Sequence, residues 1–147
     1  MQSTILVCCE HFPKQNEKIL YPFEWLDEDG LMVVHVEINS ETTLRFLLDT
    51  GSTDTYLDKN ILYIEQITLK EAIEQVEVET ANGCILADVF IIDSIEVFGV
   101  KFENHAIQVI DFIANGIISN YSGILGMDIL KQRNLCFQFA KSALTFS

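Results

Sequence analysis

The sequence predicts a predominantly β fold in one domain, and three observations support this prediction. The chain has 147 residues, of which 49% are hydrophobic, so it can bury a core without disulfide bonds or a structural metal. Its apolar residues fall in short, β-branched runs separated by turn residues, which is typical of strands. Asn82-Gly83 lies between two such runs and is a strong signal for a two-residue β-hairpin.

Residues 1–29 are interpreted as an N-terminal extension to a domain that covers residues 30–147. The extension shows no sustained hydrophobic period of either a strand or a helix. It carries more aromatic residues than a fully disordered tail would. We therefore expect it to lie against the domain through its apolar residues Tyr21, Phe23, Trp25 and Leu26.

Two predicted strands lead to the most informative residue of the chain. Residues 31–38 are apolar and β-branched, and a turn is expected at residues 39–41. Residues 43–48 form the next strand, which runs directly into Asp49. Gly51 then permits a tight bend where the chain leaves the sheet, so Asp49 is expected at a strand end.

The middle of the chain predicts a short helix followed by a projecting hairpin. Thr68 is followed three residues later by Glu71, which suggests a capping box and a helix within residues 67–75, with a strand as the alternative. Residues 76–80 and 85–92 flank the hairpin turn and predict its two arms.

The last third of the chain predicts more strands and a second short helix. Asp128 follows a glycine-containing apolar run and is a good N-cap for a helix at residues 129–132. A turn is expected at Gly99. The strands are expected at residues 95–98, 100–102 and 106–110, and at 135–139 and 143–146 as a closing hairpin.

The net charge argues against two classes of partner. It is formally −13, from 22 acidic and 9 basic residues, so nucleic acid and an anionic membrane surface would both repel the protein. No stretch approaches the roughly 18 uninterrupted apolar residues of a membrane helix. The first residues also lack the basic segment of a signal peptide.

The cysteines and histidines predict no metal site and no cofactor. The cysteines, at positions 8, 9, 84 and 136, match neither a zinc knuckle nor the disulfide framework of a small secreted domain. We expect reduced thiols and therefore a cytoplasmic location. His11, His35 and His105 have no ligand spacing and are expected at the surface or on a sheet face.

The run Asp49-Thr50-Gly51-Ser52 indicates a chemical function. Two carboxylates that share a proton can hydrolyse a peptide bond, because one accepts a proton from water while the other protonates the carbonyl oxygen. Such a pair must be held rigidly on facing turns. Asp49 would be the acid or base, Gly51 would offer its backbone N–H to the carboxylate, and Ser52 would add a hydroxyl donor. Thr50 would bond across to the second loop.

At these residues the chain resembles the retropepsin-like aspartic proteases. Phe46-Leu47-Leu48-Asp49-Thr50-Gly51-Ser52-Thr53 matches their active-site motif. Gly123-Ile124-Leu125-Gly126-Met127-Asp128-Ile129-Leu130 is similar to the run before their C-terminal helix, which packs behind the catalytic loop, here through Leu125 and Gly126. Thr80-Ala81-Asn82-Gly83 falls where the family places its flap, the hairpin that closes over substrate. The resemblance covers roughly residues 31–146.

The resemblance implies an all-β, closed barrel-like acid-protease fold with one or two short helices and a flap hairpin. It implies an aspartic endopeptidase with Asp49 as the catalytic residue and Thr50, Gly51 and Ser52 as supports of its loop. Because Asp-Thr-Gly occurs once, the active species implied is a homodimer that binds a polypeptide substrate between its subunits. The flap residues expected to contact that substrate are Ala81, Asn82 and Gly83.

Other interpretations stay open. Asp-Thr-Gly-Ser can be an ordinary turn. A retropepsin-like fold without activity would serve as a dimerisation or peptide-binding module, and the chain could instead join a different partner lobe as a heterodimer. Asp128 as a second carboxylate and Cys84 as an oxidation-sensitive flap residue are weaker hypotheses, because an N-cap and a small hairpin residue are simpler explanations.

Overall fold

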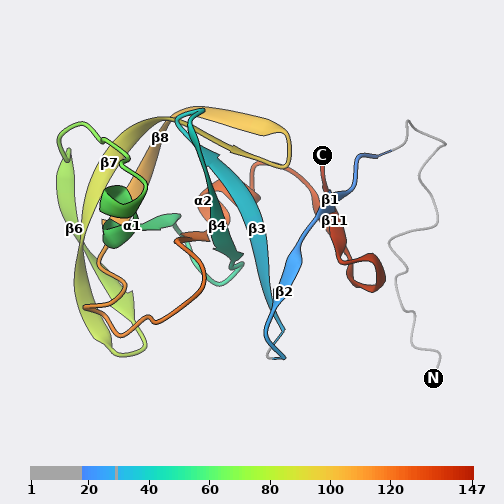
Figure 1. The fold of residues 1–147 in the computed structure, drawn as a ribbon, viewed down its shortest axis with the longest axis horizontal. Helices are drawn as coiled ribbons and strands as arrows, with labels where there is room; N and C mark the ends of the chain where they lie inside the picture. The colour runs from blue at the N-terminus through green and yellow to red at the C-terminus, as the bar shows by residue number, and fades with distance from the viewer. Residues whose placement is uncertain (1–17, 29) are drawn as a thin grey trace, which may run out of the picture.

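The computed structural model describes residues 18–28 and 30–147, which fold mainly into β-strands (Figure 1). Within these residues the larger sheet contains β2 (Glu24–Leu26), β3 (Leu31–Ile38), β4 (Thr42–Leu48), β5 (Tyr56–Asp58), β6 (Glu74–Thr80), β7 (Gly83–Val97), β8 (Val100–Ile110) and β9 (Gly123–Leu125). Their order is β2-β3-β4-β9-β5-β8-β7-β6. Because β3 also pairs with β7, the sheet curls back on itself and is barrel-like.

A smaller sheet and three short helices complete the fold. The smaller sheet has the order β1-β11-β10 and lies at the opposite end of the molecule from the β6–β7 hairpin (Figure 1). Its strands are β1 (Tyr21–Pro22), β10 (Leu135–Gln138) and β11 (Ala143–Phe146). The helices are α1 (Lys59–Ile64), α2 (Met127–Leu130) and the 3-10 helix η1 (Phe139–Lys141). No helix of the described residues is long and apolar enough to cross a membrane.

The core fixes the place where β4 and β9 end together. These two strands run parallel, with Leu48 opposite Leu125. Phe46 and Leu125 are fully buried, and a Cβ on Gly123 would lie 2.4 Å from the ring of Phe46. Glycine at position 123 therefore lets the β4 ring pack directly against the β9 backbone. The residue after β4, Asp49, leaves the sheet beside this tightly packed contact.

Most of the predicted strands are confirmed. The strand at residues 31–38 has the expected bounds, the hairpin turns at Asn82, and the chain ends in a β-hairpin. β7 and β8 are longer than predicted, since each continues through residues that the sequence divided into two runs. The turn between them contains Gly99, as expected, with a φ of 68°.

Three of the four apolar residues expected to lie against the domain are buried or half-buried there, and the fourth, Trp25, is 44% exposed. Phe23 is 4% exposed and Leu26 is 8% exposed, while Tyr21 pairs with Leu144 of β11. The described part of the predicted extension thus supplies two strands to the sheets. The boundary of the domain at residue 30 stays a prediction, and His11, Cys8 and Cys9 lie outside the described residues.

The helix predicted within residues 67–75 is wrong. The chain has no regular structure from residue 67 to 72, and the Ile73 N–H donates to the carbonyl of Val89 (2.8 Å), which draws the chain into the sheet as β6. The strand alternative is correct from Glu74 onward. The helix of this region is α1 instead, where Asp58 is the N-cap and accepts a hydrogen bond from the Asn60 N–H.

Candidate active site

Asp49 lies on a tight turn that is held by backbone hydrogen bonds from two directions. Its N–H donates to the carbonyl of Leu125 on β9 (3.1 Å), and its own carbonyl accepts from the N–H of Ser52 (3.2 Å). The side chain is half-buried. The prediction that Asp49 lies at a strand end is therefore confirmed, and the turn is anchored to the neighbouring strand.

Of the three predicted supports of Asp49, Gly51 makes the expected hydrogen bond and Ser52 does not. The Gly51 N–H donates to Asp49 Oδ1 (2.8 Å), as expected. The Ser52 hydroxyl donates instead to the carbonyl of Asp54 (2.8 Å), so it does not supply a second donor to Asp49, because a hydroxyl carries only one proton. Thr50 is exposed, and its bond across to a second loop stays a prediction.

The start of α2 packs directly behind this loop. The N–H groups of Met127 and Asp128 donate to the carbonyls of Ser52 (2.8 Å) and Thr53 (3.0 Å). A Cβ on Gly126 would lie 2.2 Å from the carbonyl oxygen of Asp54, so only glycine allows this approach. With Leu125 fully buried beside β4, both residues lie where the resemblance placed them.

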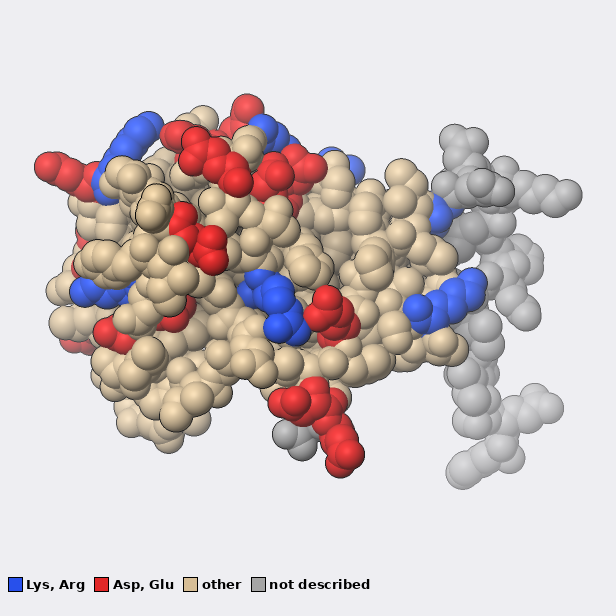
Figure 2. All heavy atoms as spheres, in the orientation of Figure 1, with Lys and Arg blue, Asp and Glu red and all other residues tan. Residues whose placement is uncertain are grey.

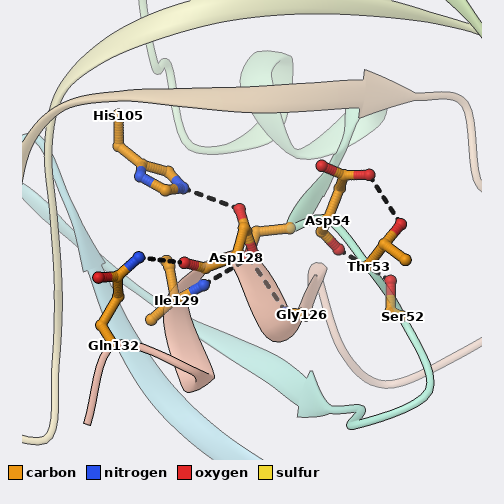
Figure 3. Close-up of polar contacts among 9 residues, drawn as sticks. Ser52, Thr53, Asp54, His105, Gly126, Asp128, Ile129 and Gln132 are labelled. Atoms are coloured by element: carbon orange, nitrogen blue, oxygen red, sulfur yellow. Dashed lines mark hydrogen bonds and ion pairs between the residues drawn. The ribbon is translucent and has the colours of Figure 1, made fainter.

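The interpretation of Asp128 as an N-cap is wrong. The N-cap of α2 is Gly126, and Asp128 lies within the first turn. Its carboxylate accepts hydrogen bonds from the Thr55 hydroxyl (2.7 Å) and the Ile129 N–H (3.0 Å), and its other oxygen lies 2.9 Å from His105 Nε2. Figure 3 shows Asp128 and His105 pointing toward each other from α2 and β8.

The pKa of Asp128 reflects these contacts. Burial raises the pKa of this carboxyl, but the hydrogen bonds from His105 and Thr55 and the charge of His105 lower it further, so the net pKa lies below the ordinary value of 3.8. Asp128 is thus held as a carboxylate. It does not line the cleft beside Asp49, which argues against the weaker hypothesis that Asp128 is a second catalytic carboxylate.

An open cleft of about 950 Å³ separates the Asp49 loop from the β6–β7 hairpin. The hairpin contributes Val78, Ala81 and Asn82 to its lining, so two of the three predicted flap contacts face the same cavity as Asp49. Gly83 is in the hairpin turn, with a φ of 120°, and does not line the cleft. The Thr80 hydroxyl ties this turn together, accepting from the Asn82 N–H and donating to the Gly83 carbonyl.

The cleft combines apolar walls with negative charge. Its apolar residues belong to a cluster around Tyr56 and Ile110. Of the described residues that line it, the charged ones are all acidic, namely Asp49, Asp54, Glu77 and Glu79. Figure 2 shows acidic side chains gathered along the upper edge of one face, with single Lys and Arg side chains among them.

The pKa of Tyr121 is raised above its ordinary value, in part by the negative charge of Asp49. Burial raises the pKa of Tyr121, a hydrogen bond with Ser119 lowers it, and the charge of Asp49 raises it again. Among the residues that the structure describes, no cluster of three His, Cys, Asp or Glu side chains could hold a metal ion.

His35 and His105 have different surroundings. His35 is exposed on β3 and lies 3.2 Å from Glu24, as expected for a sheet-face residue. The side chain of His105 is only 19% exposed and contacts Asp128. Of the two expectations for it, a sheet-face position fits its place on β8 and a surface position does not, and neither anticipated the contact with Asp128. Thr55, fully buried, was also missed. The two residues lie 50 positions apart in the sequence, and no local pattern connects them.

Comparisons with known proteins agree with this geometry. The family model described as "gag-polyprotein putative aspartyl protease" matches residues 34–132. Among solved structures, the chain is similar to a retropepsin-like aspartic protease from Rickettsia conorii, with 21% sequence identity and a TM-score of 0.61 over 88% of this chain and 89% of that one. That likeness shows the fold. No curated protein matches the sequence.

Proposed function

Because the chain belongs to the gag-polyprotein aspartyl protease family and has the retropepsin-like fold, we propose that it is an aspartic endopeptidase active as a homodimer. One observation carries this proposal. Asp49, with its carboxylate held by the Gly51 N–H, lines the same cleft as the flap residues Ala81 and Asn82. A carboxylate in a cleft with apolar walls and a hairpin across it is what one subunit would contribute to peptide hydrolysis by a pair of carboxylates.

In the proposed mechanism, Asp49 of each subunit contributes one carboxylate, and the two share one proton. The ionised carboxylate takes a proton from a water molecule, which attacks the peptide carbonyl, while the protonated one gives its proton to the carbonyl oxygen. The Gly51 N–H orients the Asp49 carboxylate, because it donates to Oδ1. The carboxyl that took the proton from water then gives it to the departing amine nitrogen as the C–N bond breaks. The other carboxylate takes a hydroxyl proton from the tetrahedral intermediate, which leaves a carboxylic acid product and restores the shared proton.

The substrate in this proposal is an extended polypeptide. Its backbone would pair with the β6–β7 hairpin and its alternate side chains would enter the cleft. We also propose a cytoplasmic location, which the free, exposed thiols of Cys84 and Cys136 support.

The test is the cleavage of a pool of unfolded peptides at several pH values by the wild type and by Asp49→Asn, with and without a transition-state-mimicking inhibitor of aspartic proteases. We expect cleavage by the wild type alone, abolished by the inhibitor. A folded, dimeric wild-type protein that cleaves nothing would favour the inactive peptide-binding module instead.

Mixed subunits test the shared active site separately. If both Asp49 carboxylates are needed, a dimer with one Asp49→Asn subunit is inactive, so an equal mixture that exchanges freely retains about one quarter of the activity per total subunit. A protein active as a monomer would retain about one half, and a dimer that needs only one of the two carboxylates would retain about three quarters. Asp58→Asn, a change of the same kind at the α1 N-cap and outside the cleft, is the control for the substitution itself.

A further inference from the structure

We propose that Thr55, His105 and Asp128 are positioning residues for the reaction, which fix the loop that carries Asp49. The inference rests on the proposed function, because it concerns the same active-site loop. None of these three side chains lines the cleft, so none is proposed to touch the substrate.

The link between these side chains and the loop begins at Thr55. Its hydroxyl accepts a hydrogen bond from the Gly126 N–H (3.1 Å) and donates its single proton to Asp128 Oδ1 (2.7 Å). Thr55 is fully buried, so a hydroxyl without these partners would lose hydrogen bonds that water could not replace. The carboxylate of Asp128 therefore determines the direction of the Thr55 hydroxyl proton. The lone pairs of the Thr55 oxygen are then free to accept from the Gly126 N–H.

His105 determines where the Asp128 carboxylate lies. Its Nε2 is 2.9 Å from Asp128 Oδ2, and both side chains are about four-fifths buried, with exposed fractions of 19% and 20%. A hydrogen bond to a carboxylate is stronger than one between neutral groups. Because His105 projects from β8, this contact connects the long β7–β8 hairpin to α2, as Figure 3 shows.

The same segment of α2 holds the carbonyls of the active-site loop. Met127 and Asp128 donate their N–H groups to Ser52 and Thr53, three and four residues after Asp49. Asp128 thus acts twice, through its backbone on the loop and through its side chain on Thr55 and His105. If the contact with Thr55 or with His105 is lost, Asp128 is held less firmly, and so is the loop that its N–H group holds. A displacement of the Asp49 carboxylate of about 1 Å is enough to slow the reaction.

The experiment compares substitutions of two histidines in the full-length dimer. His105→Leu removes the donor, His105→Gln retains an N–H, and His35→Leu is the matched control on the exposed face of β3. On a cleaved peptide we expect kcat to fall about 10-fold or more in His105→Leu with KM nearly unchanged, because the Asp49 loop moves while the β6–β7 hairpin and the apolar side of the cleft stay in place. His105→Gln should recover most of kcat, and His35→Leu should retain all of it. Sedimentation at the assay concentration must show equal dimer fractions.

Amide hydrogen exchange provides a readout that does not depend on activity. The N–H groups of Gly126, Met127 and Asp128 should exchange at least about 10-fold faster in His105→Leu and Asp128→Ala than in the wild type. Unchanged kcat in both variants, or a loss of melting temperature without a loss of kcat, overturns the positioning role. If the wild type cleaves no peptide, the proposed function fails, and the exchange rates alone decide: faster exchange supports the positioning role and unchanged exchange overturns it.

Discussion

Replacing Gly126, the N-cap of α2, by alanine tests whether the tight contact between the start of α2 and the active-site loop holds Asp49 in place. The added Cβ would lie 2.2 Å from the carbonyl oxygen of Asp54 and 2.5 Å from its carbonyl carbon. Both are backbone atoms, so no side-chain rotation relieves the contact. The loop must retreat by about 1 Å to reach ordinary van der Waals separation.

The magnitude follows from what this retreat breaks. Three hydrogen bonds cross the contact, from the N–H groups of Gly126, Met127 and Asp128 to Thr55, Ser52 and Thr53. Each contributes about 1 kcal/mol, and overpacking adds about 1–3 kcal/mol. We expect Gly126→Ala to lower the free energy of unfolding by about 4–6 kcal/mol if all three bonds are lost. We expect kcat to fall about 100-fold, because a displacement of about 1 Å misaligns the carboxylate.

The backbone of Gly126 makes the test decisive. Its φ of −103° and ψ of −176° suit any residue, so alanine introduces no torsional strain there. Without the close contact, alanine would stabilise the protein by about 0.4–1 kcal/mol through the unfolded chain. Urea unfolding at a fixed subunit concentration measures the change, with Lys131→Ala at the exposed end of α2 as the control. A stability and kcat equal to the wild type would refute the contact as the support of the loop.

Three further predictions concern charge. Two subunits of formal charge −13 repel each other, so the dimer fraction in low salt should rise from pH 7.5 to pH 4.5, which sedimentation measures. The pKa of Asp128 is lower in the folded protein than its ordinary value of 3.8, so its contribution to stability is present above 3.8 and is lost as the pH falls through the folded pKa. The difference in unfolding free energy between the wild type and Asp128→Asn should therefore shrink as the pH is lowered below 3.8. In the proposed protease, the carboxylate of Glu79 should favour a peptide with lysine near the scissile bond over a matched peptide with glutamate. Glu79→Gln should therefore lower the ratio of their kcat/KM values.

The parts of the fold that the sequence predicted correctly depend on local signals. Residues 31–38 are a β-branched run that fits a half-buried strand, and Asn82-Gly83 accommodates a tight hairpin turn whatever surrounds it. Asp49 follows from the same logic, since a strand must end where Gly51 bends the chain. These features needed no knowledge of the distant residues that pack on them.

The errors arise where a distant partner decides the outcome. Thr68 and Glu71 have capping-box spacing, yet the chain beyond them is drawn into the sheet, beginning at the hydrogen bond from Ile73 to Val89. Asp128 is a residue type that caps helices well, but Thr55 and His105 occupy its carboxylate. Neither partner has a fixed sequence separation from Asp128, so spacing rules could not identify them.

The structure also indicates how much of the active site one subunit builds by itself. The turn at Asp49 is anchored by Leu125 and Gly51 within the same chain, so its conformation does not require a partner. If two such turns meet in a dimer, little ordering entropy opposes their association, since each is already formed. The electrostatic repulsion between two acidic subunits then becomes the main cost of bringing the two carboxylates together. A change of pH would thus regulate assembly of the site without reshaping the loop that carries Asp49.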